Sequence, residues 1–229
     1  MSPRHVSILI LCLVLSGFAV SGCDEDDAVI PPEPPANFAA EDFFPLWRGV
    51  DHHFANHVDG ELISTETWYV IRSEQDQDRR TCEVLIMLYD LDQVVLGRDT
   101  VRYAFEADSV FVYNDEADEW EKDPFLSGWG AVDPPATHEF TRVNEEQGGL
   151  TVDYVAGYLG DGFDYTIESF TYPQCRKITE DATVVGQDHT VSGVRYYAME
   201  VGLVYSDLTD TYQVGETEIT IHREKLRVE

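Results

Sequence analysis

Basic residues are scarce in this chain of 229 residues, which has 15 Lys and Arg against 44 Asp and Glu and a formal net charge of −29. Only three of them are lysines, namely Lys122, Lys177 and Lys225. Nucleic-acid binding needs a basic surface that displaces the counterions of the phosphates, so the composition argues strongly against that partner. It also argues against attachment to anionic lipid through surface charge. The scattered acids indicate a solvated acidic surface rather than a set of calcium sites.

Catalytic and cofactor-binding motifs are also missing. The sequence has no Gly-x-Ser-x-Gly elbow, no phosphate-binding loop and no dinucleotide glycine fingerprint. Paired carboxylates occur throughout so acidic a chain and therefore identify no site. We expect a protein that is not an enzyme, and the sequence indicates no cofactor and no catalytic residue.

Histidines supply only a weak hypothesis of a metal site. His53 and His57 share one face of a predicted strand, and the remote His189 or His138 could complete a zinc site. Residues four apart on a strand lie about 13 Å apart, which is too far for one metal ion unless the strand is bulged. We therefore expect a solvated polar face at these histidines. His52 lies on the apolar parity and is predicted to be a hydrogen-bonded core histidine.

A long apolar run occurs at the N-terminus, where Ser7 to Val20 follows Arg4. It is shorter than the roughly 20 residues that span a bilayer. This order of charged, apolar and small residues predicts a secretory signal peptide over residues 1–22. Val20-Ser21-Gly22-Cys23 resembles the bacterial lipobox, which implies that Cys23 becomes the lipidated N-terminus and attaches the protein to a membrane of the cell envelope. The alternative is an ordinary signal peptide with an incidental cysteine.

Residues 23–37 are predicted to form a lipidated cysteine and an acidic, proline-rich tether. Asp24-Glu25-Asp26-Asp27 follows Cys23, and four prolines lie between Ala28 and Asn37. At ~3.1 Å per residue, the proline-rich segment would lift the domain roughly 30 to 40 Å from the membrane. The acids after the cysteine resemble both an inner-membrane retention signal and a surface-export signal. The sequence thus leaves open whether the protein faces the periplasm or lies on the cell surface.

Cysteines are few as well. Once Cys12 leaves with the signal and Cys23 is acylated, Cys82 and Cys175 remain. In an oxidising compartment such a pair would form a disulfide, which would stabilise the fold by roughly 4 kcal/mol in the chain-entropy model. The alternative is two buried free thiols that act as small hydrophobic side chains.

Residues 38–229 show no sustained 3.6-residue apolar stripe, which predicts a single domain that is mainly β. About ten strands joined mostly in sequence order predict an antiparallel meander, as a strongly curved sheet or an open barrel. Cys82 to Tyr89 is apolar on both parities, so we expect that strand to be covered on both faces. The apolar parity changes between Ile221 and Leu226, which predicts a bulge near Arg223.

Two segments outside the predicted strands carry clusters of aromatic residues. Glu41 to Trp47 is predicted to pack the start of the domain against the core. Asn114 to Pro135 is a long irregular loop with Trp120, Phe125 and Trp129 among acids. Such a loop either contacts a ligand or partner through its aromatic side chains or forms a lid on the core.

Both ends of the domain resemble a loose group of uncharacterised bacterial cell-envelope lipoproteins. Phe44-Pro45-Leu46 followed by Gly49 to Phe54 is similar to their opening knot and Gly-x-x-Trp-x-Tyr strand, although His52 and Phe54 replace the Trp and Tyr. Tyr196 to Val204 is similar to their closing segment. The resemblance implies a curved antiparallel sheet like that of lipoprotein-carrier or lipocalin-like folds, and no catalytic residue.

Two functions are therefore expected as alternatives. In the first, strands that are apolar on both parities line a hollow that binds or carries an apolar or amphiphilic small molecule. In the second, the protein is a structural or assembly subunit of an envelope complex, which requires a filled core and a protein partner. The presence and size of a cavity discriminate between the two.

Overall fold

The computed structural model describes residues 39–115, 118–127, 129, 133–144, 150–167 and 169–228. All of these belong to one compact unit. The predicted signal peptide, Cys23 and the tether lie outside the described residues. In the part of the chain that is described, no helix is both long and apolar enough to cross a membrane.

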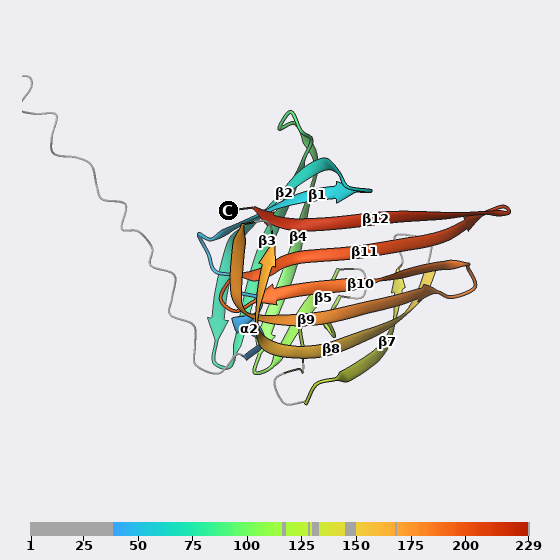
Figure 1. Ribbon diagram of the computed structural model, residues 1–229. Coiled ribbons are helices and arrows are strands. Elements are labelled where there is room, and N and C mark those ends of the chain that lie inside the picture. Colours follow the sequence, from blue (N-terminus) through green and yellow to red (C-terminus); the bar gives the residue numbers. More distant parts are fainter. Residues whose placement is uncertain are drawn as a thin grey trace, which may run out of the picture. The chain divides into compact units, whose positions relative to one another are not determined.

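Twelve antiparallel strands form one open sheet, in the order β6-β5-β4-β3-β2-β1-β12-β11-β10-β9-β8-β7 (Figure 1). They are preceded by a short helix, α2 (Ala39–Asp42). The strands are β1 (Asp51–Val58), β2 (Glu61–Asp76), β3 (Arg79–Tyr89), β4 (Val95–Glu106), β5 (Ser109–Asn114), β6 (Glu119–Lys122), β7 (Ala136–Asn144), β8 (Leu150–Ile167), β9 (Phe170–Val184), β10 (His189–Ala198), β11 (Gly202–Val214) and β12 (Thr217–Val228).

The meander is continuous because its first and last strands pair. Phe54 of β1 lies opposite Arg227 of β12, which joins the two halves of the chain into one sheet. The two ends of the sheet are β6 and β7, so the sheet is open rather than closed. The predicted fold, an antiparallel and mainly β meander in a curved open sheet, is confirmed.

The side chains of each strand alternate between the two faces of the sheet, and we call one of these the inner face. Directly opposite residues in neighbouring strands point to the same side of a sheet. The register therefore places one row of side chains across eight strands, from β2 to β7: Ser64, Asn56, Lys225, Ser206, Arg195, Ile178, Tyr158 and Ala136.

The hydrophobic core lies on this inner face and receives side chains from both halves of the sheet. It includes Phe105 of β4 and Ile178 of β9 together with Phe125 and Trp129 from the long loop. Phe125 meets the rings of β7 and β8, for example Tyr154, in an edge-to-face contact at 6.0 Å. Phe125 and Trp129 thus close the core, and of the two roles predicted for this loop the structure favours the lid.

The segment at residues 39–47 is locked into the core, as predicted from its apolar residues. Phe43, Phe44 and Leu46 are buried, and Glu41 pairs with Arg80, each side chain being 2% exposed. The Arg80 guanidinium also donates to the carbonyl of Leu46 at 2.5 Å and lies over the ring of Phe105 at 4.5 Å. These contacts fix the point at which the chain enters the sheet.

A second apolar cluster covers the opposite face of the sheet, which we call the outer face. Tyr172, Cys175, Ala198 and Val204 form it, and β8 and β10 contribute further aromatic side chains, namely Phe163, Tyr165 and Tyr196. Cys82 belongs to the inner core instead. Both thiols are free and buried, so the disulfide expected between Cys82 and Cys175 is absent. They lie on opposite faces of the sheet, and the second alternative, buried free thiols, describes them.

Two local predictions are wrong. Cys82 and Val84 are buried on β3, but the residues from Leu85 to Tyr89 are only half-buried, so this strand is not covered on both faces along its length. The register of β11 with β12 is continuous, and no bulge occurs near Arg223. The apolar parity changes along β12 because the inner face carries basic residues there while Leu226 faces outward, where it lies opposite Tyr205.

Candidate functional site

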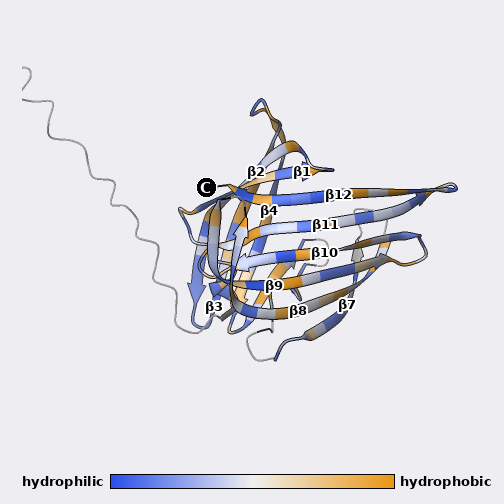
Figure 2. Ribbon diagram, viewed as in Figure 1, coloured by the Kyte–Doolittle hydropathy of each residue, from blue (hydrophilic) through white to orange (hydrophobic). Residues whose placement is uncertain are grey.

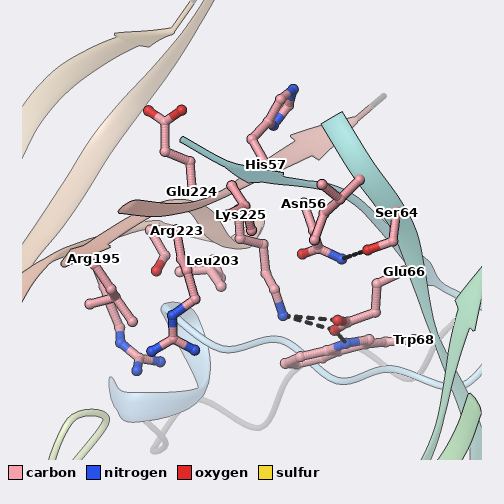
Figure 3. A pocket seen from close by; sticks show the side chains of 14 residues that line it. Asn56, His57, Ser64, Glu66, Trp68, Arg195, Leu203, Arg223, Glu224 and Lys225 are labelled. Atoms are coloured by element: carbon pink, nitrogen blue, oxygen red, sulfur yellow. Dashed lines mark hydrogen bonds and ion pairs between the residues drawn. The ribbon is translucent and has the colours of Figure 1, made fainter. Parts of the chain in front are cut away.

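The candidate site is a cleft of about 350 Å³ on the inner face (Figure 3). Strands β1, β2, β10, β11 and β12 supply its walls. Three basic side chains, Arg195, Arg223 and Lys225, line it together with apolar residues that include Trp68 and Leu203. The cleft therefore combines positive charge with an apolar wall, in a chain whose formal net charge is −29.

The side chains of β12 alternate between the two faces of the sheet, and this alternation gives the cleft its basic character. Arg223, Lys225 and Arg227 occupy alternate positions, so all three point to the inner face at a spacing of about 7 Å. Figure 2 shows hydrophilic residues along β12. In a sequence so poor in basic residues, three on one strand face form a local concentration.

Lys225 is held at the centre of the cleft by one carboxylate. Its Nζ lies 2.9 Å from Oε1 and 3.1 Å from Oε2 of Glu66. The indole N–H of Trp68 donates to the same carboxylate. This places the ammonium group beside an aromatic ring, since Nζ lies 5.6 Å from the centre of the Trp68 ring (Figure 3).

The two arginines of the cleft are also paired. Arg223 contacts Asp210 through Nε. Arg195 donates to Oε2 of Glu180 from Nε at 2.7 Å and from Nη2 at 2.5 Å. Burial alone would lower the pKa of Arg195, but Tyr197 and Glu180 outweigh it and raise the pKa. Arg195 is therefore charged at every physiological pH.

Pairing leaves part of each basic group accessible. The side chain of Arg223 is 49% exposed and that of Lys225 is 27% exposed. A guanidinium has five N–H donors in a planar fork, and the contact of Arg223 with Asp210 engages its Nε side. An anion that enters the cleft can thus bind these groups without first removing their carboxylate partners.

Arg227, the third basic residue of β12, has a structural role. One of its Nη1 hydrogens is donated to Nδ1 of His52 and another to the carbonyl of Val201, each at 2.8 Å. His52 is buried, which confirms the prediction of a hydrogen-bonded core histidine. Burial first, and then the charge of Arg227, lower the pKa of His52 to about 4, so the ring is neutral at pH 7.

The histidines considered as metal ligands are not brought together. His53 is exposed and lies 3.1 Å from Oγ1 of Thr67, and His57 follows on the same strand at the edge of the cleft. His189 begins β10, which is separated from β1 by two strands, and lies 3.5 Å from Asp210. Among the described residues, no group of three or more His, Cys, Asp or Glu side chains could hold a metal ion.

Sequence reasoning did not find the residues that line the cleft. They come from five strands distributed over most of the chain, and a carboxylate such as Glu66 does not stand out among 44 acids. One signal was available, namely the alternation of Arg223, Lys225 and Arg227 near the C-terminus. It predicts a basic strip on one face of the last strand.

The fold is similar to two solved structures. One is a candidate lipoprotein from Parabacteroides distasonis ATCC 8503, with a TM-score of 0.54 and 13% identity over 84% of this chain and 98% of that one. The other is a candidate exported protein with a YmcC-like fold from Bacteroides fragilis NCTC 9343, with a TM-score of 0.50 and 12% identity over 83% and 97%. No protein-family model and no curated protein matches the sequence. At these identities the likeness is one of fold.

Proposed function

We propose that this protein is a non-catalytic, lipid-anchored protein of the bacterial cell envelope that binds an anionic amphiphile in the inner-face cleft. The proposal rests on one observation: Arg223 and Lys225 line the same accessible cleft as apolar side chains. A phosphate or carboxylate group matches the two cations, and a short apolar chain matches Trp68 and Leu203.

The size of the cleft defines which part of the amphiphile is bound. A volume of about 350 Å³ is at the small end of ligand pockets, which span roughly 300 to 1,000 Å³. The inner core beside the cleft is filled by aromatic side chains such as Phe105, so a hollow for a whole acyl chain does not fit there. We therefore assign the head group and its first few carbons to the cleft, with the remaining chain passing the exposed Ile63 at the edge.

Three observations support the location. Val20 to Cys23 resembles a lipobox at the end of a predicted signal peptide. The two structural neighbours are described as a lipoprotein and an exported protein. Lipid on Cys23 would hold the domain at a membrane, where amphiphiles are concentrated.

The test compares amphiphiles that differ only in the head group. Decyl phosphate, decanol and decyltrimethylammonium are titrated calorimetrically, below their micelle concentrations, into the Cys23→Ser chain, which has no lipid. We expect saturable one-to-one binding of decyl phosphate and at least tenfold weaker binding of the other two. Equal binding of decyl phosphate and decyltrimethylammonium would contradict the proposal, because charge would then play no part.

A matched pair of variants assigns the binding to the cleft. Arg223→Gln together with Lys225→Gln should abolish the heat of decyl phosphate binding. Arg72→Gln removes a basic residue from an exposed ion pair with Glu74, outside the cleft, and should leave the heat unchanged.

A second role, as an assembly subunit of an envelope complex, is favoured by a separate surface. That surface lies at the turn between β3 and β4 and along the edge of β4.

A further inference from the structure

A group of large apolar side chains is exposed at one end of the sheet. We call it the apolar rim, and its members are 41% to 58% exposed: Leu62, Ile63, Leu91, Val94, Val95 and Leu96. The first two begin β2 and the other four lie in and after the turn from β3 to β4. They share one end of the sheet because Thr65 of β2 lies opposite Tyr89 of β3. Contiguous exposed apolar side chains of this kind mark interaction sites.

The rim continues into an open backbone edge. Strand β4 pairs with β3 from Val95 to Glu106, but with β5 only from Tyr103 to Glu106. Along residues 95–102, therefore, no strand among the described residues pairs with the other side of β4. This stretch presents a row of backbone N–H and C=O groups, which is a ready-made template for a further strand. In Figure 1 the hairpin of β3 and β4 extends beyond its neighbours at the upper end.

We propose that residues 95–102 of β4, together with the apolar rim, bind an extended segment of a partner protein as an added strand. Only a polypeptide in extended form offers backbone acceptors and donors at the repeat of a strand, so the edge itself defines the class of occupant. Apolar side chains of that segment would cover Val95 and Leu96. The rim shares only Ile63 with the ligand cleft, and the backbone edge of β4 that carries this proposal lies outside the cleft.

A second copy of this chain is the wrong occupant. Two copies related by a two-fold axis would pair residues of the same parity across the new contact. The two registers that overlap over most of residues 95–102 are centred on Arg98 and on Asp99, and each sets that charge against itself. Like charges directly opposite each other destabilise a sheet. Each copy also has a formal net charge of −29, which opposes the association of two copies.

The anchoring membrane is also the wrong occupant. A lipid surface has no backbone N–H and C=O groups at the repeat of a strand, so it would leave the donors and acceptors along residues 95–102 unpaired.

The test uses the full-length lipidated protein in its own cells, with a photo-crosslinking side chain placed in turn at Leu96, Arg98 and Thr100. Val214 is the matched control position, because it is 57% exposed at the turn between β11 and β12. We expect adducts of the three β4 positions with one protein, and adducts at least tenfold fewer at Val214. Mass spectrometry of the adducts should place successive β4 positions against successive alternate residues of one short segment.

Variants separate docking from folding. Leu96→Lys should reduce the adduct formed from Thr100 at least tenfold, whereas Val214→Lys should leave it unchanged, with equal thermal unfolding midpoints for both variants. The proposal is overturned if β4 yields no more adduct than Val214. It is also overturned if the adducts contain lipid or a second copy of this chain, or if the contacted residues of a partner do not advance in register along one segment.

Discussion

The basic residues of the inner face that pair with carboxylates fall into two groups, which differ in exposure: the buried Arg80, and the partly exposed Arg195, Arg223 and Lys225 of the cleft. Arg80 and its partner Glu41 are each 2% exposed, whereas Arg223 is 49% exposed beside Asp210. The first group joins the entering segment to the sheet. The second group lines the cleft. Burial, and not pairing, therefore separates the basic residues that hold the fold from those that can bind a ligand.

The difference has a physical origin in solvation. A buried pair has lost its water, so removal of one partner leaves an uncompensated charge in a poorly polarisable interior. A partly exposed pair remains solvated, and its net contribution to stability is about 0 to 1 kcal/mol. An arriving anion can replace solvent around the exposed cations, but it cannot reach Arg80.

The largest effect is expected from breaking the buried pair. Glu41→Gln leaves the charge of Arg80 uncompensated and should lower the free energy of unfolding by about 3 to 5 kcal/mol, measured by urea denaturation. Glu74→Gln, which breaks the exposed pair with Arg72, is the control and should change it by less than about 1 kcal/mol. A similar small change in both variants would show that burial does not separate the two groups.

The next effect is the pH dependence set by His52. Its pKa falls from 6.5 in the unfolded chain to about 4 in the fold, so the unfolded state binds more protons between these values. The contribution of His52 to the free energy of unfolding is fully present above pH 6.5. It declines by about 3 kcal/mol as the pH falls to 4. His52→Gln should remove this part of the pH dependence in urea denaturation at pH 7 and pH 4. An identical pH dependence in wild type and variant would contradict the role of His52.

A smaller effect is expected at the exposed pair of the cleft. Arg223→Gln should weaken decyl phosphate binding about tenfold, which corresponds to about 1.4 kcal/mol, because one charge-assisted contact is lost. Its free energy of unfolding should change by less than about 1 kcal/mol. A loss of stability that matched the loss of affinity would assign Arg223 to the structural group instead.

No effect is expected from reduction. Cys82 and Cys175 are free and buried in separate clusters. Thiol alkylation under denaturing conditions should therefore label both residues without prior reduction, and dithiothreitol should not move the thermal midpoint. A midpoint that falls on reduction would show a disulfide between them.

The fold class followed from the sequence because alternation is a local property. His52 and Phe54 alternate with polar neighbours, and both are buried on β1. The change of apolar parity on β12 was misread as a bulge, since a local pattern cannot tell that the inner face there carries charge. The same limit applies to β3, whose residues from Leu85 to Tyr89 are apolar on both parities but only half-buried on both.

The cleft could be predicted only in part. The alternation of Arg223, Lys225 and Arg227 is visible in the sequence, but their different roles are not. Arg227 donates a hydrogen bond to His52, and this contact joins residues 175 positions apart. The pairing of β1 with β12 brings them together, and no local pattern specifies that register.

The most direct test of the cleft as a binding site is the indole signal of Trp68. The chain has four tryptophans, and Trp68 is the one that lines the cleft. In a two-dimensional proton–nitrogen spectrum titrated with decyl phosphate, the Trp68 indole signal, assigned with Trp68→Phe, should shift and saturate while the other three stay in place. No shift at Trp68, or equal shifts of all four signals, would contradict the account.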